Sequence, residues 1–326
     1  MGSLNFQNEI SEIGKSVIDL EIKALKKLKK SINKSFSDAV KVILKCKSKV
    51  IICGVGKSGI IASKISATLS SVGVPSFSIS PNDCAHGDLG KITNHDILIL
   101  ISNSGNTDEL KNLIKFSKLN KIFLIGIVSN KDSSLYKYSN IKILTPEVLE
   151  SGYGLVPTSS TTSQLALGDA LSIALMKKKK FGRLDFKKFH PAGNLGKKLK
   201  TAGDVMLTGN KIPFINENEI MKKALKVLNE KKLGFLVIID NKKFNTGIFT
   251  DGDLKRLMQN KKNIENLKIK SFMTKKPYVV EENFLASEIL AQMNKRQITN
   301  VCVYQKKDKK KIIGVIHIHN LLKILK

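Results

Sequence analysis

VIICGVGKSG, residues 50–59, joins a short apolar run to a turn that is rich in glycine. Four more apolar runs follow, separated by helix-length segments, at residues 77–79, 97–101, 122–128 and 141–144. This alternation is typical of a parallel sheet with helices on both faces. We therefore expect a doubly wound α/β fold with five parallel strands, whose ligands bind beyond the carboxyl ends of the strands.

Residues 8–45 precede the first apolar run. Apolar residues recur there at near-helical spacing between Ile10 and Ile32, which predicts one or two amphipathic helices. The basic face of such a helix can touch a membrane, although such helices more often pack on their own domain or on a partner subunit.

The sequence repeats itself after about residue 200, with an offset of 67 residues. Three pairs of residues share this offset: Met206 and Met273, Gly247 and Gly314, and Leu254 and Leu321. Each copy is too small to bury its own core, so the two copies should pair with each other. We expect a first domain at residues 1–200, followed by an α+β pair at residues 201–262 and 263–326.

The length of 326 residues and the 42% of apolar residues suit two compact units with buried cores. No apolar stretch reaches the length of about 18 residues typical of a membrane span, and residues 1–20 lack the pattern of a secretory signal. The four cysteines show no paired spacing, which argues against a zinc knuckle, a redox motif or a disulfide framework. We expect a cytoplasmic protein that requires no metal.

The formal net charge of +29 would ordinarily suggest a nucleic-acid or membrane partner. However, the only arginines are Arg183, Arg256 and Arg296, and the lysines are spread over nearly every segment. Nucleic-acid recognition relies on arginine forks and aromatic platforms, and this chain has no tryptophan. We therefore expect solvated lysines, with no nucleic-acid and no membrane partner.

The glycine-rich turn after the first run is the first candidate site. Its glycines and the start of the next helix, expected from Ile60, favour an anion. A Walker A loop is excluded because position 51 is Ile, and a dinucleotide site is disfavoured because residues 60–82 contain no acidic residue. The alternative is a tight turn that binds nothing.

Polar side chains cluster in SNSGNT, residues 102–107, directly after the third run. Hydroxyl and amide side chains clustered on a turn that enters a helix can donate hydrogen bonds to a phosphate. The alternative is simple capping of the helix by Ser104 or Thr107.

Two loop histidines are candidate acid–base groups, because imidazole titrates near neutral pH. His86 lies in CAHGDLG, residues 84–90, and His190 begins HPAGNLGKKL, residues 190–199. The alternative for each is an ordinary surface histidine.

Together these motifs resemble the D-arabinose 5-phosphate isomerase family. The resemblance covers nearly the whole chain and rests on the following motifs with the repeat after them: GVGKSG (54–59), AHGDLG (85–90), ISNSGNT (101–107), PTSSTT (157–162), GDAL (168–171) and HPAGNLGKKL (190–199). It implies a sugar-isomerase (SIS) domain before tandem CBS modules, a homotetramer and no cofactor. It further implies interconversion of D-ribulose 5-phosphate and D-arabinose 5-phosphate, which feeds synthesis of the octulosonate sugar Kdo for lipopolysaccharide or capsule.

The resemblance also implies roles for individual residues. The catalytic candidates are Lys57, His86, Glu109 and His190. The residues expected to bind the substrate or its phosphate are Gly56, Ser58, Ser102, Asn103, Ser104, Thr107, Ser159 and Thr161. Two positions depart from the family pattern, because Asn106 replaces a glutamate and Ala192 replaces a glycine.

The implied reaction moves a carbonyl between C1 and C2 through a cis-enediol(ate). Such a reaction needs a base and an acid–base partner, and a cation or N–H donor near the enediolate oxygen. We expect His190 or Glu109 as the base, His86 as its partner, and Lys57 near the oxyanion or the phosphate.

In the first repeat, Thr250 and Asp253 match positions that bind a nucleotide ribose in other CBS proteins. The second repeat has His317 and Asn320 there, so a nucleotide or sugar nucleotide is expected in the first copy. The alternative is a purely structural pair. A rival interpretation of the whole chain is a non-catalytic phosphosugar-sensing regulator with the same fold, although no helix-turn-helix segment fits before Lys49.

Overall fold

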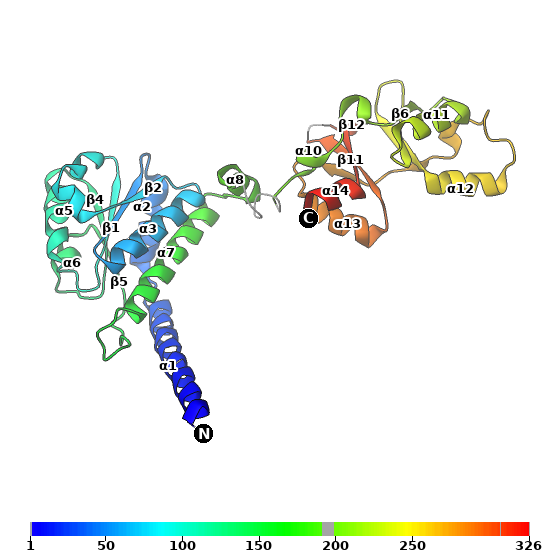
Figure 1. The fold of residues 1–326 in the computed structure, drawn as a ribbon. Helices are drawn as coiled ribbons and strands as arrows, with labels where there is room; N and C mark the ends of the chain where they lie inside the picture. Colours follow the sequence, from blue (N-terminus) through cyan, green and yellow to red (C-terminus); the bar gives the residue numbers. More distant parts are fainter. Residues whose placement is uncertain (1, 191–198, 307, 326) are drawn as a thin grey trace. The chain divides into compact units, whose positions relative to one another are not determined.

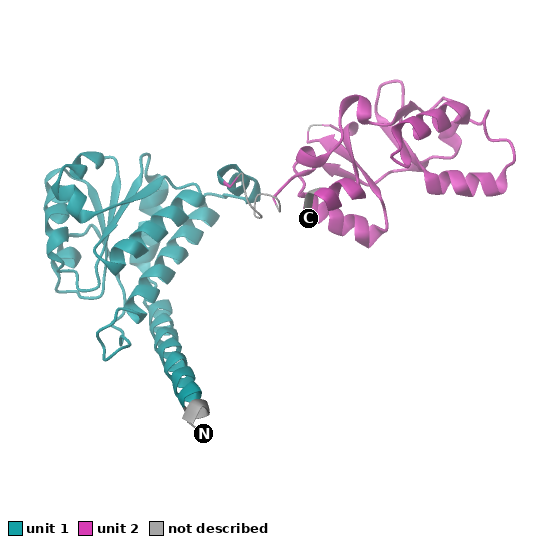
Figure 2. Cartoon of the chain, viewed as in Figure 1, with its two compact units in different colours: residues 1–189 teal, residues 190–326 magenta. Residues whose placement is uncertain are grey.

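The computed structural model describes residues 2–190, 199–306 and 308–325. The chain forms two compact units, residues 1–189 and residues 190–326 (Figure 2).

Two helices open the first unit, as the amphipathic pattern predicts: α1 (Gly2–Ser31) and α2 (Lys34–Lys45). The side chain of Asn33 accepts a hydrogen bond from the backbone N–H of Ser35 at 2.8 Å and so caps α2. Ala24 and Leu28 are buried, because this end of α1 packs along α7 (Ser159–Lys178). The other end of α1 extends away from the sheet (Figure 1).

The sheet of the first unit contains five parallel strands in the order β2-β1-β3-β4-β5. The strands are β1 (Val50–Gly54), β2 (Ser76–Ile79), β3 (Ile97–Ile101), β4 (Phe123–Val128) and β5 (Ile141–Leu144). All pairings are parallel, and Gly54 aligns with Ile101. The predicted doubly wound fold is therefore confirmed.

Alternate side chains of β1 enter the two cores of this unit. Ile52 packs with residues of α2, α3 (Lys57–Ser71) and α7 on one face of the sheet. Ile51 packs on the other face with residues of α4, α5 and α6. These last three helices span Pro81–Ala85, Asp108–Leu119 and Ser134–Tyr138. A 3₁₀ turn (Asp88–Lys91) follows α4, and α8 (Arg183–Phe189) ends the unit. The continuous apolar runs of the strands reflect burial on both faces.

The second unit contains the two repeats. The first has α10 (Ala202–Val205), β6 (Phe214–Asn216), α11 (Met221–Lys231), β7 (Phe235–Ile239), β8 (Asn245–Thr250) and α12 (Asp251–Asn260). The second has β9 (Thr274–Lys275), β10 (Val279–Glu281), α13 (Ala286–Arg296), β11 (Asn300–Gln305), β12 (Asp308–His317) and α14 (Ile318–Leu325). Short 3₁₀ turns lie at Gly209–Lys211 and Ile269–Ser271.

The first residues of each repeat pair with a strand of the other repeat. Leu207, near the start of the first repeat, forms a bridge with Val315 of the second, while β9, near the start of the second, pairs with β8 of the first. A shared core also joins the sheets, with Phe235 and Val237 on one side and Cys302 on the other. This exchange explains why neither copy needs a large core of its own.

Candidate active site

The candidate loops follow β1 and β3, the two strands between which the strand order of the sheet reverses. β1 and β3 are neighbours, but the chain proceeds from β1 to β2 on one side and from β3 to β4 on the other. The helices after these strands, α3 and α5, cover opposite faces. In parallel α/β sheets this arrangement opens a crevice beyond the strand ends, where ligands bind.

Lys57 is the first residue of α3, so the helix begins three residues earlier than the sequence predicts. Gly56 makes this early start possible because its φ of 56° turns the chain directly into the helix. A side chain at Gly54 would meet the carbonyl carbon of Ser58 at 2.7 Å, so this position requires glycine. Lys57 itself is exposed, and the Ser58 hydroxyl donates to Gln164 Oε1 of α7 at 3.1 Å.

A pocket of about 400 Å³ lies between the turn after β1 and the loop after β2. Gly56 and Ile60 line one side, and Ser78 and Ser80 line the other. Ser63, also in the lining, lies within hydrogen-bond distance of Ser78, with 2.8 Å between their hydroxyl oxygens. The pocket therefore offers backbone groups and hydroxyls to a polar ligand at the carboxyl end of the sheet.

The loop at residues 102–107 is braced by its own side chains. The buried Ser102 hydroxyl lies 2.7 Å from the Thr107 hydroxyl and accepts a hydrogen bond from the Gly105 N–H at 3.0 Å. Thr107 makes no side-chain cap to α5, so the capping alternative does not account for this residue. Asn103 and Ser104 are exposed and remain available to a ligand.

His86 and Glu109 lie on neighbouring elements. His86 follows α4 directly, and its backbone N–H donates to the Asp83 carbonyl at 3.0 Å. Glu109 lies in the first turn of α5, which packs against α4. Both residues are exposed, so both are accessible to a substrate.

His190 is half-buried and is the first residue of the second unit. The rest of its motif, residues 191–198, lies outside the described residues. Its participation in the site therefore stays a prediction.

The PTSSTT motif forms the start of α7. The Ser159 side chain is completely buried, and its hydroxyl has no hydrogen-bond partner among the described residues. The Thr161 hydroxyl donates to the Thr158 carbonyl at 2.9 Å. The Ser159 side chain is thus enclosed by protein, and the Thr161 hydroxyl bonds to the backbone of its own helix. The proposed contact of these two residues with substrate stays a prediction.

Glu150 is a polar residue of this region that the sequence analysis does not single out. Its carboxylate accepts hydrogen bonds from the backbone N–H groups of Thr158 at 2.8 Å and Ser160 at 3.3 Å. Burial acts to raise the pKa of Glu150, but the hydrogen bonds from Ser160 and Thr158 outweigh this and lower it. One signal could have indicated this role. The first turn of α7 contains no acidic residue of its own, so a carboxylate from outside the helix is needed to interact with the positive end of its dipole.

Comparison with known proteins agrees with this arrangement. The SIS domain model matches residues 43–174, and the CBS domain model matches residues 202–260 and 269–326. Arabinose 5-phosphate isomerase KdsD of Yersinia pestis is 40% identical over 317 residues, which cover 97% of this chain and 96% of the relative. The chain belongs to the arabinose 5-phosphate isomerase family. The resemblance predicted from the motifs is confirmed.

Two further relatives support membership of this family. Arabinose 5-phosphate isomerase KdsD of Escherichia coli K12 is 39% identical and covers the same shares of both chains. The solved structure of E. coli CFT073 c3406 in complex with arabinose 5-phosphate is 38% identical and has a TM-score of 0.55. It covers 56% of this chain and 98% of that chain.

The two CBS modules of this family member differ at their predicted ligand positions. In the first, Thr250 and Asp253 form a capping box at the start of α12, and Asp253 also pairs with Arg256 at 2.5 Å. In the second, His317 Nδ1 accepts a hydrogen bond from the His319 N–H at 3.3 Å. Burial, and then the neighbouring His319, lower the pKa of His317. The second copy thus lacks the carboxylate but keeps a side-chain cap.

No cluster of three or more His, Cys, Asp or Glu side chains that could hold a metal ion occurs within the described residues. Among the same residues, no helix combines the length and apolar character needed to cross a membrane.

Proposed function

We propose that this chain is an aldose–ketose isomerase that interconverts D-ribulose 5-phosphate and D-arabinose 5-phosphate. The observation that carries the proposal is the convergence of the turn at residues 54–59 and the loop at residues 102–107 beyond neighbouring strands of one sheet. The names of relatives that match 97% of the chain support the same substrate class. The ligand of the related structure, arabinose 5-phosphate, supports it further.

The proposed reaction proceeds through a cis-enediol(ate). A base removes the proton from C1 of the ketose while the C2 carbonyl oxygen is protonated. A proton is then delivered to C2, and loss of the O1 proton forms the aldehyde at C1. Because the product is an isomer of the substrate, the balance needs no cofactor and no metal.

We assign the proton transfers at carbon to His190 or Glu109, with His86 as the acid–base partner. Proton transfer of this kind contributes about 10² to 10⁴ in rate. Lys57 is exposed at the start of α3, where a positive charge can stabilise the enediolate oxygen or the phosphate. Asn103 and Ser104 present polar groups to the phosphate at the next strand end.

The decisive experiment follows the conversion of ribulose 5-phosphate by NMR, with ribose, glucose and fructose phosphates as competitors. Lys57→Ala and His190→Ala are expected to lower kcat/KM at least about 100-fold. Lys64→Ala is the matched control, because Lys64 lies on the same helix and pairs with Asp169. Retained isomerisation in both site variants would contradict the assignment. No turnover by the unmodified chain, with salt-sensitive DNA binding, would favour the regulator instead.

The wider role is also a proposal. We propose a homotetramer, with an SIS domain at residues 1–200 and CBS modules at residues 201–262 and 263–326. We further propose that the product feeds Kdo synthesis in the cytoplasm. A nucleotide or sugar nucleotide is proposed at Thr250 and Asp253. Calorimetric titration with AMP, ATP and a sugar nucleotide tests this site, and the absence of heat would favour a structural role for the pair.

A further inference from the structure

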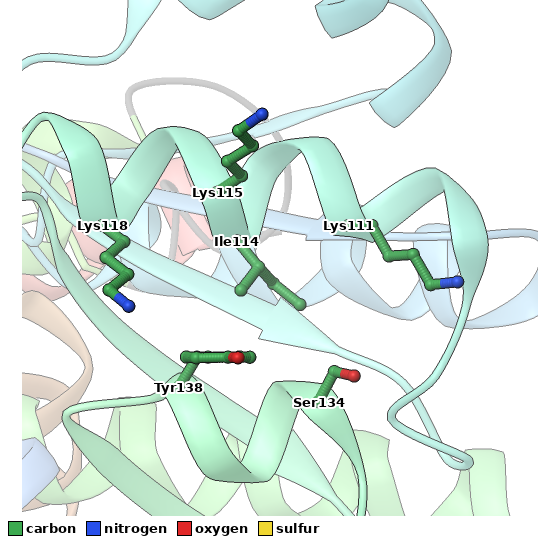
Figure 3. Close-up of a pocket in the computed structure, with 6 residues that line it drawn as sticks. All are labelled: Lys111, Ile114, Lys115, Lys118, Ser134 and Tyr138. Carbon is green, nitrogen blue, oxygen red and sulfur yellow. The ribbon is translucent and has the colours of Figure 1, made fainter.

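A second pocket lies on the outer side of the first unit, between α5 and α6. Its volume is about 290 Å³, and its lining residues are Lys111, Ile114, Lys115, Lys118, Ser134 and Tyr138 (Figure 3). None of these residues belongs to the proposed active site, and no part of the proposed reaction uses them.

The two ends of this pocket differ in chemistry. At one end, Lys118 Nζ lies 5.2 Å from the centre of the Tyr138 ring. At the other end, the Ser134 side chain faces Lys111 across the groove, and Ile114 lies between the two ends (Figure 3). Lys111 and Lys118 are seven residues apart on one helix, which separates them by about 10 Å along its axis. Lys115 points away from α6 (Figure 3).

Positive charge dominates the walls of this pocket. The acidic side chains of α5 are Asp108 and Glu109, both in its first turn. Lys111 pairs with Asp108 at 2.5 Å, whereas Lys118 has the Tyr138 ring as its neighbour and pairs with no carboxylate among the described residues. The Ser134 hydroxyl makes no hydrogen bond within the same residues and is half-buried. The pocket thus offers two ammonium groups, a hydroxyl and an aromatic face.

Both walls of the pocket are attached to the loop at residues 102–107. α5 begins at Asp108, directly after this loop. The first turn of α6 is held by the loop through two hydrogen bonds, from the Ser134 N–H to Asn106 Oδ1 at 2.9 Å and from the Leu135 N–H to the Gly105 carbonyl at 3.0 Å. A ligand that moves α5 and α6 relative to each other would therefore also move this loop.

We infer that this pocket binds a nucleoside diphosphate. The flat base fits the end with Tyr138, with Ile114 at its edge. It can stack on the ring once the Lys118 side chain, whose Nζ lies 5.2 Å from the ring centre, swings outward to contact the far face of the base. The diphosphate fits the end with Lys111 and Ser134, where an ammonium and a hydroxyl can bind its oxygens. A simple anion would leave the aromatic end empty, and an uncharged ring would leave the cations unused.

Calorimetric titration of the full chain with ADP tests this site. We expect ADP to bind, and pyrophosphate and adenosine, which each carry half of the ligand, to bind at least about tenfold more weakly. The double variant Lys111→Gln/Lys118→Gln is expected to weaken ADP binding about tenfold or more, because the charge-assisted hydrogen bond from Lys111 and the cation–π contact from Lys118 are lost. Asp108→Asn is expected to tighten it, because this change releases Lys111 from its carboxylate.

Two controls show whether ADP binds at this pocket or elsewhere on the chain. Lys23→Gln/Lys26→Gln removes the same charge from exposed positions of α1 and should leave ADP binding unchanged. Asp253→Asn removes the ligand position proposed in the first CBS module, so the ADP binding that persists in this variant belongs to the pocket, and we expect it to persist. An unmodified chain that gives no heat with ADP, or a Lys111→Gln/Lys118→Gln variant that binds ADP as tightly, would overturn the inference. Loss of binding in Asp253→Asn alone would do the same and would place ADP in the second unit.

The link to the loop has a readout of its own, which rests on the proposed isomerase function. Saturating ADP should change the KM for ribulose 5-phosphate in the unmodified chain but not in Lys111→Gln/Lys118→Gln. Because ADP binding is measured without turnover, failure of the isomerase assay and failure of the ADP site are distinguishable. ADP that binds in the pocket without any effect on KM would overturn the proposed link while leaving the site intact.

Discussion

Asn106 Oδ1 accepts a hydrogen bond from the backbone N–H of Ser134 at 2.9 Å. This bond joins the loop after β3 to the first turn of α6. Asn106 is also a position at which the resemblance to the family leads us to expect a glutamate. The amide thus holds the loop in place, which gives this departure a structural role within the first unit.

Asn106→Ala should leave the Ser134 N–H without its acceptor. We expect the free energy of unfolding of the first unit to fall by about 1 kcal/mol, as for the loss of a helix cap. Asn106→Asp keeps an oxygen acceptor at the same place and should retain most of the stability. Urea unfolding of the three chains measures the difference, and equal midpoints for Ala and Asn would contradict the role of this bond.

Gly105 is the most constrained residue of the same loop. Its φ is 70°, and a Cβ atom there would overlap the Ser133 hydroxyl and the Val128 side chain. Gly105→Ala should therefore destabilise the first unit by about 2 kcal/mol or more. Gly90→Ala is the matched control, because a Cβ atom at Gly90 meets nothing within 4 Å, and it should have little effect. Thermal unfolding followed by circular dichroism distinguishes the two variants.

The sequence predicts the sheet well because burial on both faces leaves continuous apolar runs. The run expected at residues 97–101 coincides with β3, and that at residues 141–144 coincides with β5. The residue at which a helix begins is harder to predict from the sequence, as α3 shows. It begins at Lys57 because Gly56 adopts a positive φ, and a backbone angle leaves no trace in hydrophobic periodicity.

The candidate site, too, is predictable from the sequence only in part. Glycines and clustered hydroxyls locate the turns after β1 and β3, because these residue types meet local backbone demands. They do not reveal which hydroxyls turn inward. Ser102 and Ser159 are buried, whereas Ser104 is exposed. The role of Glu150 cannot be predicted either, because only the path of the folded chain brings Thr158 and Ser160 to its carboxylate.

Asp96 should make the first unit sensitive to acid. Its side chain is fully buried and accepts hydrogen bonds from Ser48 Oγ at 2.6 Å and from the Thr93 N–H at 2.7 Å, and Lys49 Nζ lies at 3.1 Å. Burial acts to raise the pKa of Asp96, but these hydrogen bonds outweigh it and lower the pKa from 3.8 to about 2. A carboxyl with a lowered pKa stabilises the fold above its unfolded pKa, and this stabilisation is lost as the pH falls towards 2.

Asp96→Asn should therefore cost about 2 kcal/mol at pH 7 and progressively less below pH 4. Urea unfolding at several pH values measures this. Asp38→Asn serves as the control, since Asp38 forms a solvent-accessible pair with Lys41 on α2 and should cost little at any pH. A cost for Asp96→Asn that stays constant down to pH 2 would contradict the assignment.

The outer half of α1 carries an apolar seam with no partner among the described residues. Phe6, Ile10 and Ile13 are 63%, 53% and 58% exposed. They continue the three- and four-residue spacing of Ala24 and Leu28, which are buried where α1 meets its own unit. Several large apolar side chains in one exposed row indicate a contact surface. In the proposed homotetramer, a second copy of this chain covers this seam.

Ile10→Asp/Ile13→Asp should therefore lower the mass of the assembly at least twofold, because two charges cannot be buried in an apolar seam without a large desolvation penalty. Light scattering coupled to size-exclusion chromatography measures the mass. Lys15→Asp changes the charge of the same helix at a position that is exposed and paired with Glu12, and it should leave the mass unchanged. If the seam variant keeps the full mass while its helix content is unaltered, α1 does not hold the subunits together, and the assembly must be built on another surface of the first unit or on the CBS pair.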